Sequence, residues 1–194
     1  MFIRNLLITG FITIFNCMLS GQEYAVDKNA VFLNFAGSYS NQSGIFVKMN
    51  SDDAATSSMF STSINYFAVQ NFFVGLGFEI SDQSRKNYSS KSFAIGPQMG
   101  YMIGHESSAI YPFFDMGVRY ESMSYDDNTM SESKASGVEL FIGAGTLIPV
   151  QKHIGFVFFG EYHMYNLKDK EEDDNELIMG EIIVLGIGIV GLLH

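Results

Sequence analysis

The residues of this chain best suited to chemistry are charged side chains set within long apolar segments. They comprise six carboxylates, one guanidinium and one imidazole: Glu79, Asp115, Glu121, Glu139, Glu161, Glu181, Arg119 and His163. Charged groups in an apolar setting must be paired or hydrogen-bonded, because an isolated buried charge is very costly. The sequence therefore predicts a network centred on Arg119, and the elements that carry these residues decide what it can do.

Apolar residues alternate with small or polar ones along these segments. Over residues 74–81, Val, Leu, Phe and Ile alternate with Gly, Gly, Glu and Ser. A period of two is typical of β-strands. On this basis the sequence predicts eight strands, at about Ala30 to Asn41, Ser57 to Val69, Phe72 to Asp82, Lys91 to Ile103, Ser108 to Met123, Ser136 to Pro149, Ile154 to Leu167 and Glu176 to Leu192.

The connections between these strands are alternately long and short. The longer polar ones cover residues 42–56, 83–90, 124–135 and 168–175, and the short ones cover 70–71, 104–107 and 150–153. Short turns on one side and longer loops on the other are typical of bacterial outer-membrane barrels. The predicted fold class is all-β, an eight-stranded antiparallel up-and-down transmembrane β-barrel. Pro97 and Pro112 remove ladder donors, so a bulge or local break is expected near them.

The distribution of charge favours a barrel in a membrane over a soluble one. Charged residues make up only 16% of the chain, and Arg119 is the one basic residue well inside a predicted strand. One strand face is bulky and apolar, as at Phe93 and Phe114, and the other is small, as at Gly75 and Gly143. Small residues suit the narrow lumen of an eight-stranded barrel. The net charge of −10 argues against a nucleic-acid partner, since phosphate binding needs clustered basic residues.

The N-terminal segment has the pattern of a cleaved signal peptide. One basic residue, Arg4, precedes an apolar run from Leu6 to Leu19, and small residues follow. The predicted organisation is a signal peptide over residues 1–21 and an outer-membrane β-barrel domain over 22–194. Cys17 is the only cysteine, so the mature chain would have none; acylation of Cys17 is the alternative.

Four segments carry a resemblance to a known family: Ile64-Asn65-Tyr66-Phe67, Asn71-Phe72-Phe73-Val74-Gly75-Leu76-Gly77, Phe93-Ala94-Ile95-Gly96-Pro97 and Tyr111-Pro112-Phe113. Through them the mature chain resembles the small outer-membrane β-barrel proteins of Gram-negative bacteria, of the OmpA-transmembrane-domain and OmpX type, within the porin family. The resemblance implies location in the cell outer membrane, contact with lipid and lipopolysaccharide, and insertion by the barrel-assembly machinery. It implies a monomer and names no reaction.

The eight charged residues are all expected to face the lumen, where an ion-paired network would fill and rigidify the barrel. The leading hypothesis is a non-enzymatic protein that anchors four surface-exposed loops for envelope integrity, adhesion or host interaction. The partner would be an extracellular ligand of the loops. A narrow channel gated by the Arg119 network is the first alternative.

A lipid A-modifying enzyme is the second alternative. Acyl chemistry of that kind needs a serine with a histidine in reach. The four histidines are expected in short turns (His105 and His153), in the lumen (His163) and at the terminus (His194). None is expected on the lipid-facing surface near the outer leaflet, so no enzyme, cofactor or metal is predicted. The acidic segment 168–176 does not match an EF-hand loop and is predicted to be a solvated loop.

Overall fold

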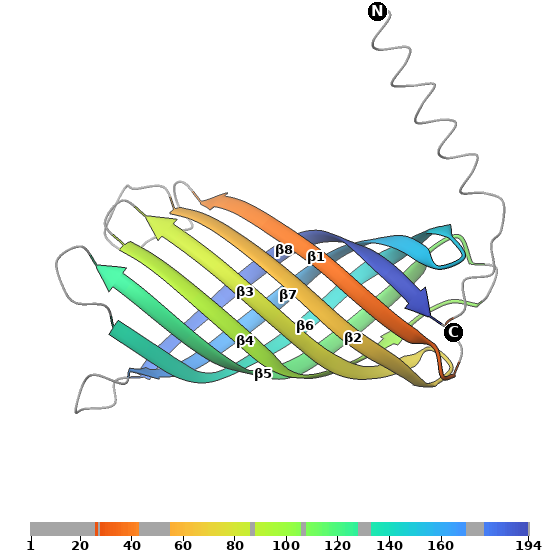
Figure 1. Cartoon of the computed structure of the whole chain (residues 1–194), viewed down its shortest axis with the longest axis horizontal. Coiled ribbons are helices and arrows are strands. Elements are labelled where there is room, and N and C mark those ends of the chain that lie inside the picture. Colours follow the sequence, from red (N-terminus) through yellow and green to blue (C-terminus); the bar gives the residue numbers. More distant parts are fainter. Residues whose placement is uncertain are drawn as a thin grey trace, which may run out of the picture.

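The chain forms a closed, eight-stranded antiparallel barrel in which each strand pairs with its neighbours in sequence and β1 pairs with β8 (Figure 1). The computed structural model describes residues 26, 28–42, 55–85, 88–105, 108–127, 133–169 and 177–193. The strands are β1 (Val31–Gln42), β2 (Ala55–Val69), β3 (Phe72–Arg85), β4 (Tyr88–Met102), β5 (Tyr111–Asp127), β6 (Ser133–Gln151), β7 (Ile154–Asp169) and β8 (Leu177–Leu193). The predicted fold class is confirmed. The expected signal peptide, residues 1–21, lies outside the described residues.

The short connections and the C-terminal end of β8 lie at one end of the barrel, and the strand ends that lead into the other four connections lie at the opposite end (Figure 1). Most strands extend beyond their predicted bounds at the latter end. The ladder between β3 and β4 continues to Arg85 and Tyr88, so only residues 86–87 separate these strands, where a longer loop was expected. The residues at these strand ends are mostly polar, so hydrophobic and polar residues do not alternate there. The predicted strands are therefore too short at this end.

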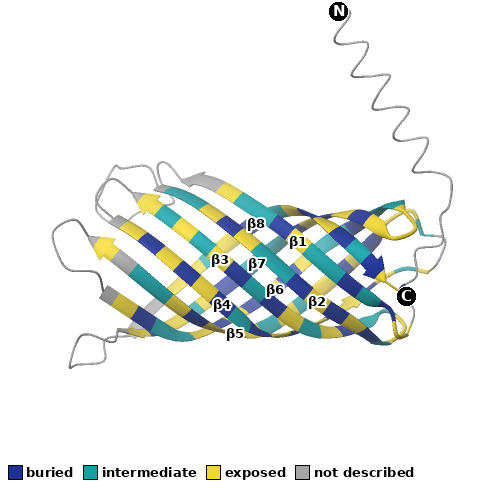
Figure 2. Ribbon diagram, in the orientation of Figure 1, coloured by how far each residue is buried: buried dark blue, intermediate teal, exposed yellow. Residues whose placement is uncertain are grey.

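Burial alternates along every strand, as predicted from the period of two (Figure 2). Large apolar side chains face outward and form a belt around the barrel. On the loop side the belt ends at Phe60, Ile80, Phe93, Tyr120, Val138, Met164 and Ile183, and the next outward residues are polar: Ser58, Asp82, Lys91, Ser122, Ser136, Asn166 and Glu181. On β8 the belt runs from Ile183 to Leu193, about ten residue steps of ~3.3 Å, or about 23 Å across a membrane at ~45° tilt. That height matches the apolar band of an outer-membrane barrel.

Of Pro97 and Pro112, one interrupts the ladder and the other does not. Pairing between β4 and β5 is lost at Gly96 and Pro97 and resumes in the same register at Gln98. Pro112, the second residue of β5, stays in register opposite Thr146. The expected break is therefore found at Pro97 only, since a missing donor is easily tolerated at the start of a strand.

An apolar layer fills the lumen at the end with the tight turns. Its members share near-complete burial and inward orientation: Phe32, Phe67, Phe73, Met102, Tyr111, Phe113, Leu147, Val157, Val190 and Leu192. Three of these rings meet with centroids 5.5–6.2 Å apart, Phe32, Phe67 and Phe73. Val26, before β1, is buried against this layer, and its carbonyl accepts a hydrogen bond of 3.0 Å from the Asn71 amide. The apolar layer thus closes this end of the lumen.

Across the described part of the chain, no helix is long and apolar enough to cross a membrane.

Candidate functional site

The inward residues of β3, β5, β6 and β7 bring a set of charged groups together above the apolar layer. We call Glu79, Asp115, Arg119, Glu121, Glu139, Glu161 and His163 the lumen cluster. At its centre, Arg119 Nη1 donates to Glu79 Oε2 at 2.6 Å and to Glu139 Oε1 at 3.4 Å. All three side chains are at most 4% exposed. The structure therefore contains the predicted network around Arg119, which stands on β5 and joins β3 to β6 through Glu79 and Glu139.

Small residues make the room that Arg119 needs to reach across β4. Gly77 and Gly96 lie between Arg119 on β5 and Glu79 on β3. A Cβ at Gly96 would lie 2.6 Å from the Arg119 Cα, and one at Gly77 would lie 3.5 Å from Arg119 Nε. The guanidinium carbon sits 4.0 Å from the centre of the Phe141 ring, a cation–π contact. The absence of side chains at Gly77 and Gly96 thus leaves the space that the Arg119 side chain occupies in the lumen cluster.

His163 links two more carboxylates to this centre. Its Nδ1 contacts Glu139 Oε1, and its Nε2 lies 3.0 Å from Glu161 Oε2. The imidazole is fully buried and stacks with Phe141 and with Tyr165, with ring centroids 5.9 and 6.2 Å away. With both nitrogens engaged and the side chain fully buried, His163 is held inside the lumen and cannot reach a substrate at the barrel surface.

The remaining two acids of the lumen cluster are only partly satisfied. Asp115 lies over Gly143 beside Glu161, and Glu121 is hydrogen-bonded by the Ser92 hydroxyl. Asp115 Oδ1, Glu121 Oε2 and Glu139 Oε2 are buried and have no hydrogen-bond partner among the described residues. Five carboxylates thus face one arginine and one histidine, an imbalance that only protons or further cations could offset.

The eighth predicted residue, Glu181, does not belong to the lumen cluster. It is exposed on the outer face of β8, opposite Met164 of β7, and the Tyr162 hydroxyl hydrogen-bonds its carboxylate. The expectation that it faces the lumen is therefore wrong. Val184, Gly188, Val190 and Leu192 point inward, which puts the odd-numbered residues of β8 outside. Glu181 lies just beyond the apolar belt, at the level where lipid headgroups begin.

A group of uncharged polar side chains inside the lumen was not predicted from the sequence. Gln98 Nε2 donates to Asn65 Oδ1 at 2.9 Å, and Asn65 Nδ2 donates to Ser63 Oγ at 2.9 Å. All three side chains are buried. Their inward phase could have been read from the same alternation that placed Glu79, because each lies on the small-residue face of its strand.

Glu79, Glu139 and His163 offer ligand atoms within 4.8 Å of one another, the kind of set that can hold a metal ion. The Arg119 guanidinium, however, already binds both carboxylates. A second cation in the same space would meet its charge directly. The arrangement favours the ion-paired network over a metal centre.

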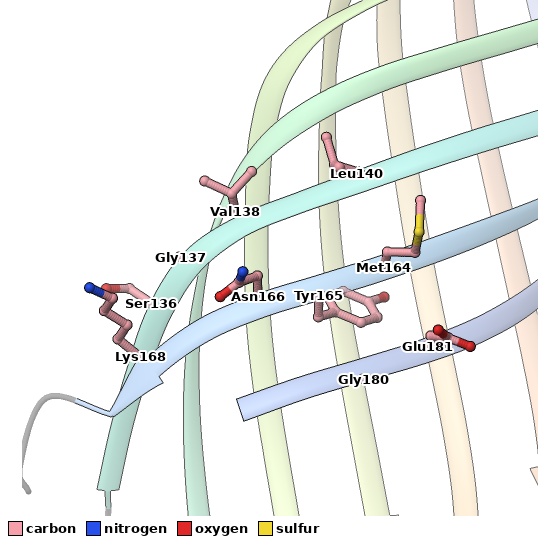
Figure 3. Close-up of a pocket in the computed structure, with 10 residues that line it drawn as sticks. All are labelled: Ser136, Gly137, Val138, Leu140, Met164, Tyr165, Asn166, Lys168, Gly180 and Glu181. Carbon is pink, nitrogen blue, oxygen red and sulfur yellow. The ribbon is translucent and has the colours of Figure 1, made fainter. Parts of the chain in front are cut away.

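One groove lies on the outside of the barrel, across β6, β7 and β8 (Figure 3). Its volume is about 800 Å³. Leu140 and Met164 line its part within the apolar belt, whereas Asn166, Lys168 and Glu181 line its part beyond the belt. Histidine and cysteine are not among its lining residues, whereas Ser136 and Lys168, which face each other in the register of β6 and β7, are.

Comparison with known proteins finds similarity in structure only. No family model and no curated protein sequence matches the chain. The crystal structure of Neisserial surface protein A (NspA) superposes with a TM-score of 0.60 at 13% identity, covering 84% of this chain and 96% of that one. The N-terminal β-barrel domain of Pseudomonas aeruginosa OprF gives 0.56 at 14% identity, covering 86% and 98%. The outer membrane protein OprG of the same organism gives 0.55 at 14%, covering 87% and 97%.

These barrels and the apolar belt agree with the expected location in the outer membrane. The chain thus has the fold of the small eight-stranded barrels solved for these outer-membrane proteins.

Proposed function

We propose that this protein is a non-enzymatic, non-conducting barrel that anchors four loops at the outer surface, for envelope integrity, adhesion or host interaction. The observation that carries the proposal is the double closure of the lumen. The apolar layer fills one end, and the lumen cluster crosses the middle, with Arg119 bridging β3 and β6. A barrel that is closed inside has its outer wall and its loops left for contact with other molecules.

The loops themselves differ in length and charge. They cover residues 43–54, 86–87, 128–132 and 170–176, all outside the described residues. The last contains five acids, at 171–174 and 176, and one lysine. A strongly acidic loop favours a basic partner surface and disfavours an anionic one.

A loop-exchange experiment tests the anchoring role. Each loop is replaced in turn by a Gly/Ser segment of equal length in the full chain, and cells carrying each variant are assayed for adhesion to immobilised extracellular matrix. We expect loss of adhesion from at least one exchange, with the heat-modifiable mobility of the folded barrel unchanged. Adhesion equal to that of cells without the protein, for the unaltered chain, would contradict an adhesive role, and detergent sensitivity would then be compared to test envelope integrity.

The channel alternative has no support in the described lumen. We expect no single-channel conductance above background from the purified chain in planar bilayers. Discrete openings that change in Arg119→Ala would instead favour a gated channel.

The enzyme alternative needs a reactive pair near the outer leaflet. Within the described barrel wall, the histidine is His163, which is buried in the lumen. We expect the mass spectrum of lipid A to be the same with and without expression of the protein. A lost or added acyl chain would overturn the non-enzymatic assignment.

A further inference from the structure

The wall of the barrel is incomplete where its first and last strands meet. The ladder between β1 and β8 begins at Val31–Leu193 and ends at Gly37–Ile187. Within the described residues, the rest of β1 pairs only with β2, up to Gln42–Ala55, and the rest of β8 pairs only with β7, up to Leu177–Lys168. The other neighbouring strands are paired along nearly their whole length. We call the facing edges of residues 38–42 and 182–186 the open seam.

The side chains along the open seam show that the two edges are apart. Leu185, Ile183 and Tyr39 are 75%, 72% and 69% exposed, whereas the other large apolar residues whose exposure is described on the outer face are at most 58% exposed. These three residues point outward from the two edges of the open seam. Each lacks the cross-strand neighbour that covers its counterparts elsewhere in the belt.

The depth of the open seam decides what surrounds it. The apolar belt ends on β8 at Ile183, and the last ladder pair between β1 and β8 is Gly37–Ile187, so the open seam begins in the loop-side third of the apolar belt. With loops at the outer surface, this third lies in the outer leaflet. At that depth the medium is lipid, and water is not available to bond the free backbone groups.

The open seam has two kinds of binding group. On the β8 side its inner wall is apolar, because Val184 is buried and Ile182 packs against the core; on the β1 side the inward residue is Ser38, next to the buried Ala36 at the closed end. Its edges present backbone N–H and C=O groups that lack a ladder partner. An occupant must therefore be apolar along its length and must carry both donors and acceptors of hydrogen bonds near its polar end.

We propose that the open seam is a binding slot for one acyl chain of lipopolysaccharide. An amide-linked hydroxyacyl chain supplies the apolar length, an N–H and an O–H as donors, and carbonyl and hydroxyl oxygens as acceptors. A glycerophospholipid offers only ester acceptors near its chains, so it leaves the carbonyl groups of the two edges without partners. The slot goes beyond the anchoring of loops and does not depend on it.

A reversible disulfide can close the slot, because the chain after residue 17 contains no cysteine. If the ladder continued in register, Tyr39 would face Leu185. The test variant is Tyr39→Cys with Leu185→Cys. The matched control is Phe35→Cys with Ile189→Cys, an outward pair that is already in register in the closed part of the same ladder. Both proteins are purified folded and reconstituted into bilayers with or without lipopolysaccharide.

Two measurements decide the proposal. The first is disulfide formation under mild oxidant: cysteines more than about 7 Å apart cannot cross-link without backbone movement. We expect the control pair to cross-link in every bilayer, and the test pair to cross-link at least tenfold more slowly with lipopolysaccharide than in phosphatidylethanolamine and phosphatidylglycerol alone.

The second measurement is native mass spectrometry of bound lipid. We expect the control to retain lipopolysaccharide in both redox states. The cross-linked test variant should retain about tenfold less, which corresponds to about 1.4 kcal/mol of binding free energy. Reduction of the disulfide should restore its binding. Equal cross-linking of both pairs with lipopolysaccharide, equal retention by the locked variant, or retention of phospholipid in its place would overturn the slot. A cross-link between two copies would overturn it in favour of strand pairing between protomers.

Discussion

Replacing Arg119 tests whether the lumen cluster holds the barrel together. The guanidinium is 4% exposed and bridges Glu79 and Glu139, so its removal leaves two buried carboxylates without their cation. Breaking a buried ion pair in this way costs about 3–5 kcal/mol, to which loss of the contact with the Phe141 ring adds roughly 1 kcal/mol. We expect Arg119→Met, which keeps most of the side-chain volume, to lower the free energy of unfolding by about 4 kcal/mol.

The assay is urea unfolding of the protein in lipid vesicles, followed by the mobility difference between folded and unfolded chains on unheated gels. An ordinary domain has about 5–15 kcal/mol of stability in total, so a loss of this size moves the midpoint well outside experimental error. The control is a triple variant, Arg119→Met with Glu79→Gln and Glu139→Gln, which removes the charges on both sides. We expect it to recover at least half of the loss, because replacing a whole buried ionic group is much less costly than breaking it.

Two results would refute this reasoning. A loss below about 1 kcal/mol in Arg119→Met would show that the bridge is no stronger than an exposed ion pair. A triple variant no more stable than Arg119→Met would show that the loss comes from packing rather than from uncompensated charge.

Three further predictions concern packing and phase. Gly96→Ala places a Cβ 2.6 Å from the Arg119 Cα and should severely reduce the yield of folded protein. Gly191→Ala places a Cβ with no other atom within 4 Å and should leave the yield nearly unchanged. The fraction of heat-modifiable protein after refolding measures both effects. Phe73→Ala removes a buried ring from the apolar layer and should cost about 3–5 kcal/mol in the same urea assay, and a loss below about 1 kcal/mol would contradict a packed layer. Glu139→Gln should destabilise the barrel by about 2 kcal/mol, whereas Glu181→Gln should change its stability by less than about 0.5 kcal/mol; equal effects would contradict the outward position of Glu181.

The strands and most of their phases could be predicted because one face of each strand meets lipid and the other meets a narrow lumen. Over residues 74–81 this difference gives strict alternation, and the structure places Glu79 inside as expected. On β8 the same signal is missing, since residues 182–185 are all apolar. A continuous apolar run has no period, so the phase of Glu181 is fixed only by the register of β8 against β7 and by the inward packing of Val190 and Leu192.

The partners within the lumen cluster could not be read from the sequence. Glu79 and Glu139 lie 40 and 20 residues from Arg119, and other acids lie closer along the chain. Glu139 is selected because the register of β5 and β6 places it opposite Arg119. Glu79 is selected because Gly77 and Gly96 clear a path across β4. Both facts depend on pairing between strands, which the composition of a single strand does not specify.

The open seam, too, could not be predicted from the sequence, because it depends on how β1 pairs with β8. In a barrel, the first and last strands are the pair joined by no turn, so their register is set only by side-chain fit and by closure of the other ladders. On β1 and β8 this fit is strong where Gly188 lets the strands approach, with a Cβ there lying 2.8 Å from that of Ala36. Beyond Gly37 the apolar residues Tyr39, Ile183 and Leu185 gain as much from lipid as from each other, so contact between side chains adds no force to close the ladder. The unpaired backbone groups there must instead be bonded by an occupant. We expect the apolar layer and the lumen cluster to hold the barrel together without those last pairs, so that the seam can stay open for the proposed occupant.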